Sequence, residues 1–199
     1  MPNLYHYIHT PSKDLMGHSY NLMDLFDVFN LGVPRKDKPN KRRYPGILWS
    51  QDVTIAHGMS EPDMAKLMAA SDVFSVATAG EGFGLPLIEA MCCGTPTVAP
   101  DVSAHPDFMR GAAPLIPIEY YVCETMSGYY RGYPDLDAYL TELYTLLTNK
   151  EYHDTVGISC RKRALEYNWN GVADKWDALI SSELKSVNKI KRWKRLVTI

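Results

Sequence analysis

Two glutamates and a cluster of glycines gather where an extended run of the sequence gives way to a helix. Residues 72–77 form a short apolar run, the glycine-rich segment 79–84 contains Glu81, and residues 85–93 have helical spacing with Glu89 inside the helix. Glycines let a backbone come close to a ligand, and the free N–H groups at a helix start suit a phosphate. Carboxylates accept hydrogen bonds from sugar hydroxyls. The pattern therefore indicates a site for a ligand that carries both phosphates and hydroxyls.

A simpler interpretation exists for each part of this pattern. A glutamate in a glycine turn can merely place a favourable charge at the start of the helix dipole, and Glu89 alone could be a solvated residue. The neighbours of Glu89 are, however, apolar on several sides of the helix, namely Leu85, Leu87, Ile88 and Met91. We therefore expect Glu89 to be buried, and a buried carboxylate needs a partner.

The elements around this segment alternate between strand and helix. Strands are expected at residues 4–9, 46–50, 72–77, 96–100 and 114–118, and helices at 22–29, 60–71, 85–93, 104–110, 136–147, 150–167 and 172–185. We expect the basic stretch 35–43 and the tyrosine-rich stretch 120–133 to be loops. Such alternation predicts an α/β, Rossmann-like parallel sheet with helices on both faces, and a run as short and apolar as 72–77 suits a strand buried on both faces. In a sheet of this kind the glycine-rich segment lies at the carboxyl ends of the strands, where ligands bind.

Two later helices have apolar stripes. Leucines spaced like one helical face predict which side of the first packs on the core, namely Leu136, Leu140, Leu143 and Leu147. The apolar side of the last helix contains Trp176, Leu179, Ile180 and Leu184. Asp135 and Asp137 spell a D-x-D pattern, but their place at a helix start favours capping over metal binding.

Composition excludes several classes of protein. The chain has 199 residues, a formal net charge of −2 and four cysteines without the paired spacing of a zinc site. The charge gives no reason to expect nucleic acid, and the histidines show no metal-binding spacing, so neither a metal nor a cofactor is expected. No apolar run is long enough to cross a bilayer and no signal peptide is visible, so we expect a cytoplasmic protein.

The run Glu81-Gly-Phe-Gly-Leu-Pro-Leu-Ile-Glu89, followed by Ala90-Met-Cys-Cys-Gly-Thr-Pro96, resembles the E-x7-E signature of retaining glycosyltransferases of the GT-B fold, family 4. Residues 60–72 and 101–107 are similar to the segments that flank this signature, and residues 164–169 with Trp176 are similar to the C-terminal helices. The resemblance implies a nucleotide-sugar-binding, Rossmann-like domain over residues 1–182 and a basic helical tail over residues 183–199.

The resemblance also implies roles for single residues. Glu81, the catalytic candidate, would contact the hydroxyls of the donor sugar, and Gly82, Phe83 and Gly84 would offer N–H groups to the sugar or the diphosphate. Leu85 would lie at the helix start under the diphosphate, and Glu89 would bind the ribose. Such enzymes transfer a hexose with retention of configuration, and the leaving phosphate helps to deprotonate the acceptor, so stabilisation of that phosphate is the main catalytic contribution.

The resemblance covers only the second of the two domains of such an enzyme. A first strand and helix, which carry an Arg and a Lys against the diphosphate, should precede Leu4, so the first strand is expected to be missing. The implied partners are a nucleotide sugar, an unknown acceptor and a missing N-terminal domain or partner chain. For the basic residues from Lys185 to Arg195 a solvated helix is favoured, with contact to an anionic membrane as the alternative. Two alternative functions stay open, a non-catalytic nucleotide-sugar-binding or regulatory module and a GT-B-like nucleotide-sugar epimerase.

Overall fold

The computed structural model describes residues 4–8, 33–34, 42–43, 47–49, 58–125 and 128–196, with side chains of the last helix described as far as residue 185. The helix expected at residues 22–29 lies outside these residues. The chain divides into two compact units, Met1–Asp63 and Met64–Ile199, and each is described by itself.

Two pairs of short strands lie among the described residues of the first unit. Strand β1 (His6–Ile8) pairs in parallel with β4 (Ile47–Trp49), which confirms the strands expected at 4–9 and 46–50. Strand β2 (Val33–Pro34) pairs antiparallel with β3 (Arg42–Arg43). The expectation of a loop throughout residues 35–43 is therefore wrong at its end, because Arg43 pairs with Val33 in a ladder whose hydrogen bonds come from the backbone and do not depend on the charge of the side chain.

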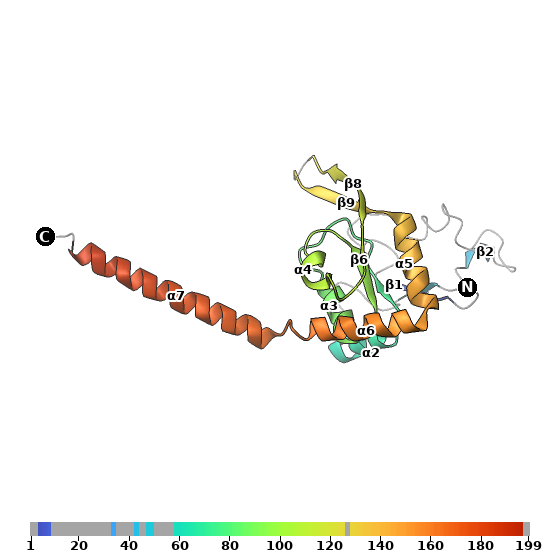
Figure 1. Ribbon diagram of the computed structural model, residues 1–199, viewed down its shortest axis with the longest axis horizontal. Coiled ribbons are helices and arrows are strands. Elements are labelled where there is room, and N and C mark those ends of the chain that lie inside the picture. The colour runs from blue at the N-terminus through green and yellow to red at the C-terminus, as the bar shows by residue number, and fades with distance from the viewer. Residues whose placement is uncertain are drawn as a thin grey trace. The chain divides into compact units, whose positions relative to one another are not determined.

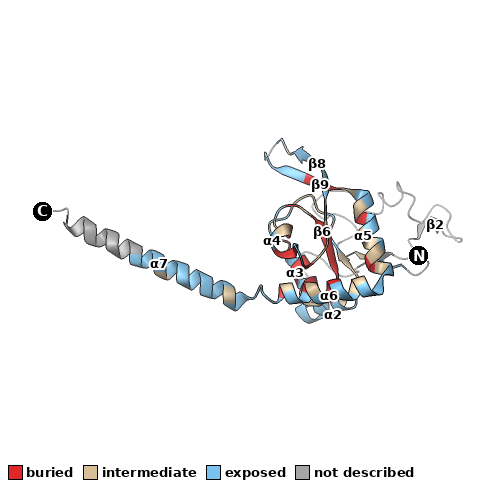
Figure 2. Cartoon of the chain, viewed as in Figure 1, coloured by how far each residue is buried: buried red, intermediate tan, exposed pale blue. Residues whose placement is uncertain are grey.

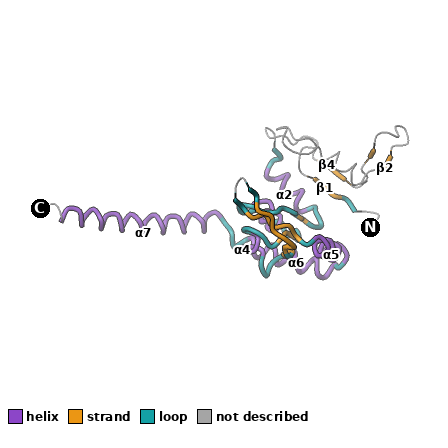
Figure 3. Tube along the Cα trace, turned by 90° about the horizontal axis from the view of Figure 1, so that it is seen from above, coloured by secondary structure: helices purple, strands orange, loops and turns teal. Residues whose placement is uncertain are grey.

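The second unit contains a parallel sheet in the order β5-β6-β7, flanked by helices (Figure 1). The strands are β5 (Phe74–Ser75), β6 (Thr97–Pro100) and β7 (Leu115–Ile116). The helices are α3 (Leu85–Cys92), α4 (His105–Met109), α5 (Leu136–Thr148), α6 (Lys150–Ala164) and α7 (Trp169–Leu196). Helix α2 (Glu61–Ala69) begins in the last residues of the first unit and continues into the second. The expected α/β fold is thus confirmed, and Figure 3 shows helices gathered around the strands.

The core lies where α3 and α6 pack beside β6, whose four residues are all buried (Figure 2). The close approach of these two helices depends on Gly157 of α6, because a Cβ placed there would lie 2.6 Å from the backbone oxygen of Gly94. Arg161 of α6 also donates from Nη1 to the carbonyl oxygen of Cys92, 2.5 Å away, at the C-terminal end of α3. A cation there complements the helix dipole, so α6 fixes that end of α3.

Two burial expectations are wrong. Leu136 and Leu140 of α5 are exposed, whereas Tyr139 and Leu146 are buried. The helix is turned so that the large ring of Tyr139 enters the core, where its hydroxyl donates to the carbonyl oxygen of Val98 at 3.3 Å. Strand β5 is not buried on both faces either, because Ser75 is exposed.

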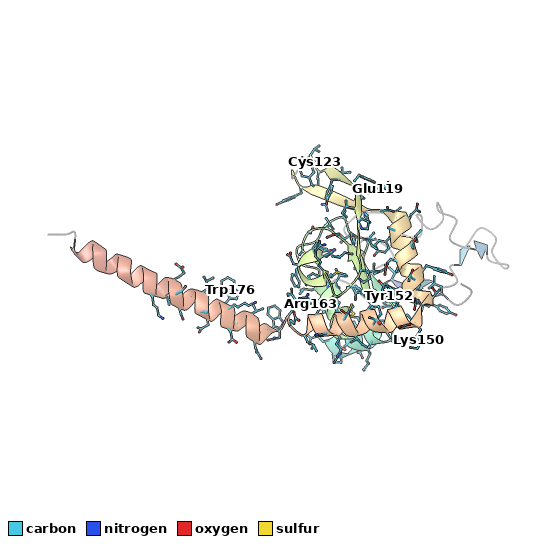
Figure 4. All side chains as sticks on the ribbon, viewed as in Figure 1. Glu119, Cys123, Lys150, Tyr152, Arg163 and Trp176 are labelled. Carbon is cyan, nitrogen blue, oxygen red and sulfur yellow. The ribbon has the colours of Figure 1, made fainter. Side chains whose placement is uncertain are left out.

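A loop was expected at residues 120–133, but residues 120–123 and 130–133 belong to the two paired strands of a β-hairpin. Strand β8 (Ile118–Cys123) pairs antiparallel with β9 (Tyr130–Pro134), and Figure 4 labels Glu119 and Cys123 on β8. The rings of Tyr120 and Tyr133 stack at 5.1 Å across the two strands. Tyrosine and valine favour strands, and this cross-strand pairing outweighs the glycines of the segment.

Helix α7 runs without interruption through residues 182 and 183, where the boundary between domain and tail was expected. Trp169 and the four residues of its expected apolar stripe are exposed, including Trp176, labelled in Figure 4. Within the described part of the chain, no helix is long and apolar enough to cross a membrane.

Burial of Tyr139 predicts a loss of stability in alkali. Burial raises the pKa of this phenol to about 12, although hydrogen bonds partly oppose the shift. Between pH 10 and 12 the unfolded chain loses this proton while the folded chain keeps it, so the free energy of unfolding should fall as pH rises. We expect Tyr139→Phe to show a shallower fall than the parent in urea unfolding measured from pH 9 to 12. Equal slopes for the two proteins would contradict the assignment.

Candidate functional site

The glycine-rich segment follows β5 and leads directly into α3. Thr78 orders its beginning, because the Thr78 hydroxyl donates to the carbonyl oxygen of Gly80 at 2.9 Å and accepts from the N–H of Gly80 at 3.3 Å. The hairpin contacts the same point, since the N–H of Gly132 donates to the carbonyl oxygen of Ala79 at 2.9 Å. The segment is therefore held from both sides before it reaches Glu81.

Ser103 supports the segment from the loop after β6. Its hydroxyl accepts from the N–H of Glu81 at 3.3 Å. Ser103 has a φ of 54°, a left-handed conformation that is uncommon for residues other than glycine. Backbone strain of this kind persists where the surroundings enforce it, and it concentrates at binding sites.

Gly84 is the N-cap residue of α3 and requires the absence of a side chain. Its φ is 89° and its ψ is 51°, and it offers no side-chain cap. A Cβ at this position would lie 3.0 Å from Cδ1 of Leu87 and 3.4 Å from Nε2 of His105. Glycine therefore suits this position for two reasons, because it adopts a positive φ without strain and because it has no side chain to press on its neighbours.

Four consecutive N–H groups at this turn have no acceptor among the described residues. They belong to Gly82, Phe83, Gly84 and Leu85. Pro86 has no N–H to add, and the N–H of Leu87 already donates to the carbonyl oxygen of Gly84 at 2.9 Å. Unpaired N–H groups at a helix N-terminus, aided by the helix dipole, form an anion-binding site.

Glu81 and Glu89 are both exposed, so the expectation that Glu89 is buried is wrong. The buried side of α3 comprises Leu87, Ile88, Ala90 and Met91, while Leu85 is 53% exposed. Glu89 lies four residues after Leu85, and so it shares the open face of the helix one turn beyond the anion-binding end. Its carboxylate can reach a ligand without a cost of burial.

Aromatic packing anchors the tip of the segment. The ring of Phe83 lies 5.0 Å from that of Phe108, which is fully buried, and 6.3 Å from that of Tyr167. Phe83 itself stays 37% exposed. Its side chain thus anchors the loop to the core, and its N–H is one of the four without an acceptor among the described residues.

The sequence reasoning missed Ser103 and His105 as neighbours of the site. Both belong to the stretch 101–107, which was noted only as a flanking segment, and their positions depend on the parallel pairing of β5 with β6. The one available signal was that loops following adjacent parallel strands meet at the same edge of a sheet.

Within the described residues there is no group of three or more His, Cys, Asp or Glu side chains that could hold a metal ion. Asp135 instead caps α5, because its carboxylate accepts from the N–H of Ala138 at 3.0 Å, as its place in the sequence predicted. Burial raises the pKa of the Cys92 thiol, which opposes thiolate chemistry near the site.

Comparison with known proteins points to one class of enzyme. Residues 33–121, which include the glycine-rich segment and α3, match the family described as "Glycosyl transferases group 1". The sulfoquinovosyl transferase SQD2 of Arabidopsis thaliana is 25% identical over 139 residues, covering 70% of this chain and 25% of that protein. The MMP alpha-(1->4)-mannosyltransferase of Mycolicibacterium hassiacum is 29% identical, covering 62% of this chain and 28% of that protein.

Solved structures agree on the fold. Sucrose-phosphate synthase from Thermosynechococcus elongatus matches 90% of this chain and 38% of its own with a TM-score of 0.63 and 19% identity. The HepE protein of Anabaena, solved with UDP and glucose, matches 69% of this chain and 32% of its own with a TM-score of 0.53 and 18% identity. The chain therefore has the fold of the GT-B glycosyltransferases, and its relatives in sequence are glycosyltransferases. It spans about a quarter of the length of the curated relatives SQD2 and the mannosyltransferase.

Proposed function

We propose that this chain is the donor-binding half of a retaining glycosyltransferase of the family 4 type. It binds a nucleotide-diphosphate sugar and presents the hexose to an acceptor in the cytoplasm. The observation that carries the proposal is the row of unpaired N–H groups from Gly82 to Leu85, which matches the charge of a diphosphate. No metal or other cofactor takes part.

Each of the two carboxylates binds a different part of the nucleotide sugar. Glu89, one turn along the open face of α3, binds the ribose hydroxyls. Glu81, before the anion-binding turn, binds the hydroxyls of the donor sugar. Because the phosphate is the leaving group, the N–H groups at the start of α3 stabilise the charge that develops on it. The acceptor and the rest of the catalytic cleft come from an N-terminal domain or a partner chain.

A thermal-shift experiment tests donor binding directly. The parent protein is heated with UDP, GDP, ADP and their common sugar conjugates, because a ligand that binds only the folded state raises the melting temperature. We expect a rise with one nucleotide family. A protein that melts cooperatively but shows no shift with any of these ligands would overturn the proposal.

Paired variants then separate the two carboxylates. We expect Glu89→Ala to weaken both the free nucleoside diphosphate and its sugar conjugate by roughly tenfold, as for loss of charge-assisted hydrogen bonds. Glu81→Ala should weaken only the sugar conjugate. Calorimetric titrations of both ligands provide the measurement, and Glu151→Ala, an exposed change at the start of α6, is a matched control. Identical affinities in all four proteins would refute the division of roles.

The exposed face of α7 suggests where a further contact forms. Trp169, Trp176 and Leu184 leave apolar surface open on this helix, which continues into the basic stretch from Lys185 to Arg195. An amphipathic helix with basic residues suits an anionic membrane surface. Co-sedimentation with anionic vesicles, compared with neutral vesicles, tests this part of the proposal.

A further inference from the structure

His105 carries a buried ring nitrogen without a partner. The side chain is fully buried, and its Nδ1 lies 2.9 Å from the carbonyl oxygen of Pro100. Among the described residues, Nε2 of His105 is the one buried side-chain nitrogen or oxygen atom that has no hydrogen-bond partner. A buried polar atom left unpaired lowers stability, so its persistence calls for an explanation.

The unpaired nitrogen faces the anion-binding turn. A Cβ at Gly84 would lie 3.4 Å from Nε2 of His105 and 3.5 Å from Cδ2, so this edge of the ring borders Gly84. Gly84 belongs to the same turn as the four unpaired N–H groups, which run from Gly82 to Leu85. Because Gly84 has no side chain, this edge of the ring lies next to the turn with no side chain between them.

The protonation of the ring follows from its partner. A carbonyl oxygen can only accept, so Nδ1 of His105 carries a proton and donates it to Pro100. In the neutral ring Nε2 therefore carries no proton, and a second proton there would place a positive charge in a buried position. A bound anion would supply both the opposite charge and a hydrogen-bond acceptor for that proton.

We propose that His105 is a ligand-binding residue whose Nε2–H donates to a phosphoryl oxygen of the diphosphate beside Gly84. On binding, Nε2 takes one proton from solvent, and no covalent bond is made or broken. This inference rests on the proposed function, since it assumes that a diphosphate lies at the start of α3. It adds a positive charge to a site whose other donors are backbone N–H groups.

Inorganic pyrophosphate is the probe, because it needs no knowledge of the base or the sugar. Long-range ¹H–¹⁵N spectra report the protonation of each ring nitrogen of the six histidines, and His105 is assigned from the signal that its variants lose. We expect pyrophosphate to move the Nε2 signal of His105 from the unprotonated to the protonated type, while its Nδ1 signal stays protonated. A His105 spectrum unchanged at saturating pyrophosphate would overturn the inference.

Two variants separate ligand binding from mere support of the loop. His105→Asn keeps an amide nitrogen near the position of Nδ1, and hence the bond to Pro100, but removes Nε2. His105→Gln places an amide nitrogen near Nε2 and gives up the bond to Pro100. We expect the Asn variant to bind pyrophosphate roughly tenfold to a hundredfold more weakly than the parent, and the Gln variant to recover part of that loss. If His105 only supported the loop, the order of the two variants would be reversed.

The outcomes distinguish this inference from the proposed function. Binding of one nucleoside diphosphate that depends on Glu89 but is unchanged in His105→Asn would leave the function intact and overturn the role of His105. A failure of pyrophosphate, UDP, GDP and ADP to bind the parent protein would overturn both. Thermal unfolding of each variant identifies any protein that no longer folds. If a variant does not fold, the ¹H–¹⁵N spectrum of the parent protein with pyrophosphate tests the role of His105 instead.

Discussion

Gly157→Ala is expected to lower the free energy of unfolding by about 2 kcal/mol, the usual scale for overpacking in a tight core. The new methyl group would lie 2.6 Å from the backbone oxygen of Gly94, and a backbone atom cannot turn aside as a side chain can. Helices α3 and α6 would have to separate. The gain in helix propensity, about 1 kcal/mol for alanine over glycine, offsets only part of the cost.

Gly171→Ala in α7 is the matched control for that change. Gly171 is also helical, but its nearest contact for a new Cβ is the Asn168 side chain at 3.5 Å, an ordinary distance. Differential scanning calorimetry should show a melting temperature roughly 4–8 °C lower for Gly157→Ala and one near the parent value for Gly171→Ala. If both variants melted like the parent, the close packing of α3 on α6 described here would be wrong.

Gly84→Ala is expected to reduce diphosphate binding at least a hundredfold while the protein still folds. Alanine in the left-handed region costs about 1–2 kcal/mol, and the methyl group would lie 3.0 Å from Cδ1 of Leu87 and 3.4 Å from Nε2 of His105. Relief of that close contact would shift the turn and, with it, the four unpaired N–H groups. Loss of several charge-assisted hydrogen bonds together explains the size of the effect.

The control for Gly84→Ala is Gly111→Ala. Gly111 has a similar φ of 77°, but a Cβ there meets nothing within 4 Å. The two variants should therefore share the backbone strain and differ in ligand binding, measured by calorimetry with pyrophosphate and with UDP, GDP and ADP. Equal affinities for both variants and the parent would show that the turn at Gly84 does not hold the ligand.

The features of the structure that the sequence predicts correctly are mainly those set by residues close to one another in the sequence. The glycine-rich turn, α3 and the cap at Asp135 follow from local rules of backbone conformation and capping, and the structure confirms them. The alternation of strands and helices was sufficient to predict the parallel sheet.

The errors arise where the result depends on distant neighbours. The spacing of apolar residues in α5 is compatible with more than one face of the helix packing on the core. The face with Tyr139 is the one that packs there, where the Tyr139 hydroxyl bonds to the carbonyl oxygen of Val98, a residue far away in the sequence. The number of apolar residues in α3 suggested that the helix is buried all round. Glu89 is exposed because the buried residues of α3 lie on one side of the helix. His105 lies beside the site because β5 pairs with β6. No pattern of neighbouring residues in the sequence indicates which side chains this pairing brings together.

The hairpin β8–β9 begins and ends at nearly one point. The N–H of Asp135 donates to the carbonyl oxygen of Pro117 at 2.9 Å, which closes the base of the hairpin between β7 and α5. Closing a loop of different length at such a base changes the loop entropy little. The intervening residues can consequently be exchanged during evolution, or replaced by design, without rerouting the backbone on either side. The hydrogen bond from Gly132 to Ala79 nevertheless keeps the hairpin beside the glycine-rich segment, so a change in the hairpin can alter the surroundings of that segment while the backbone on either side stays in place.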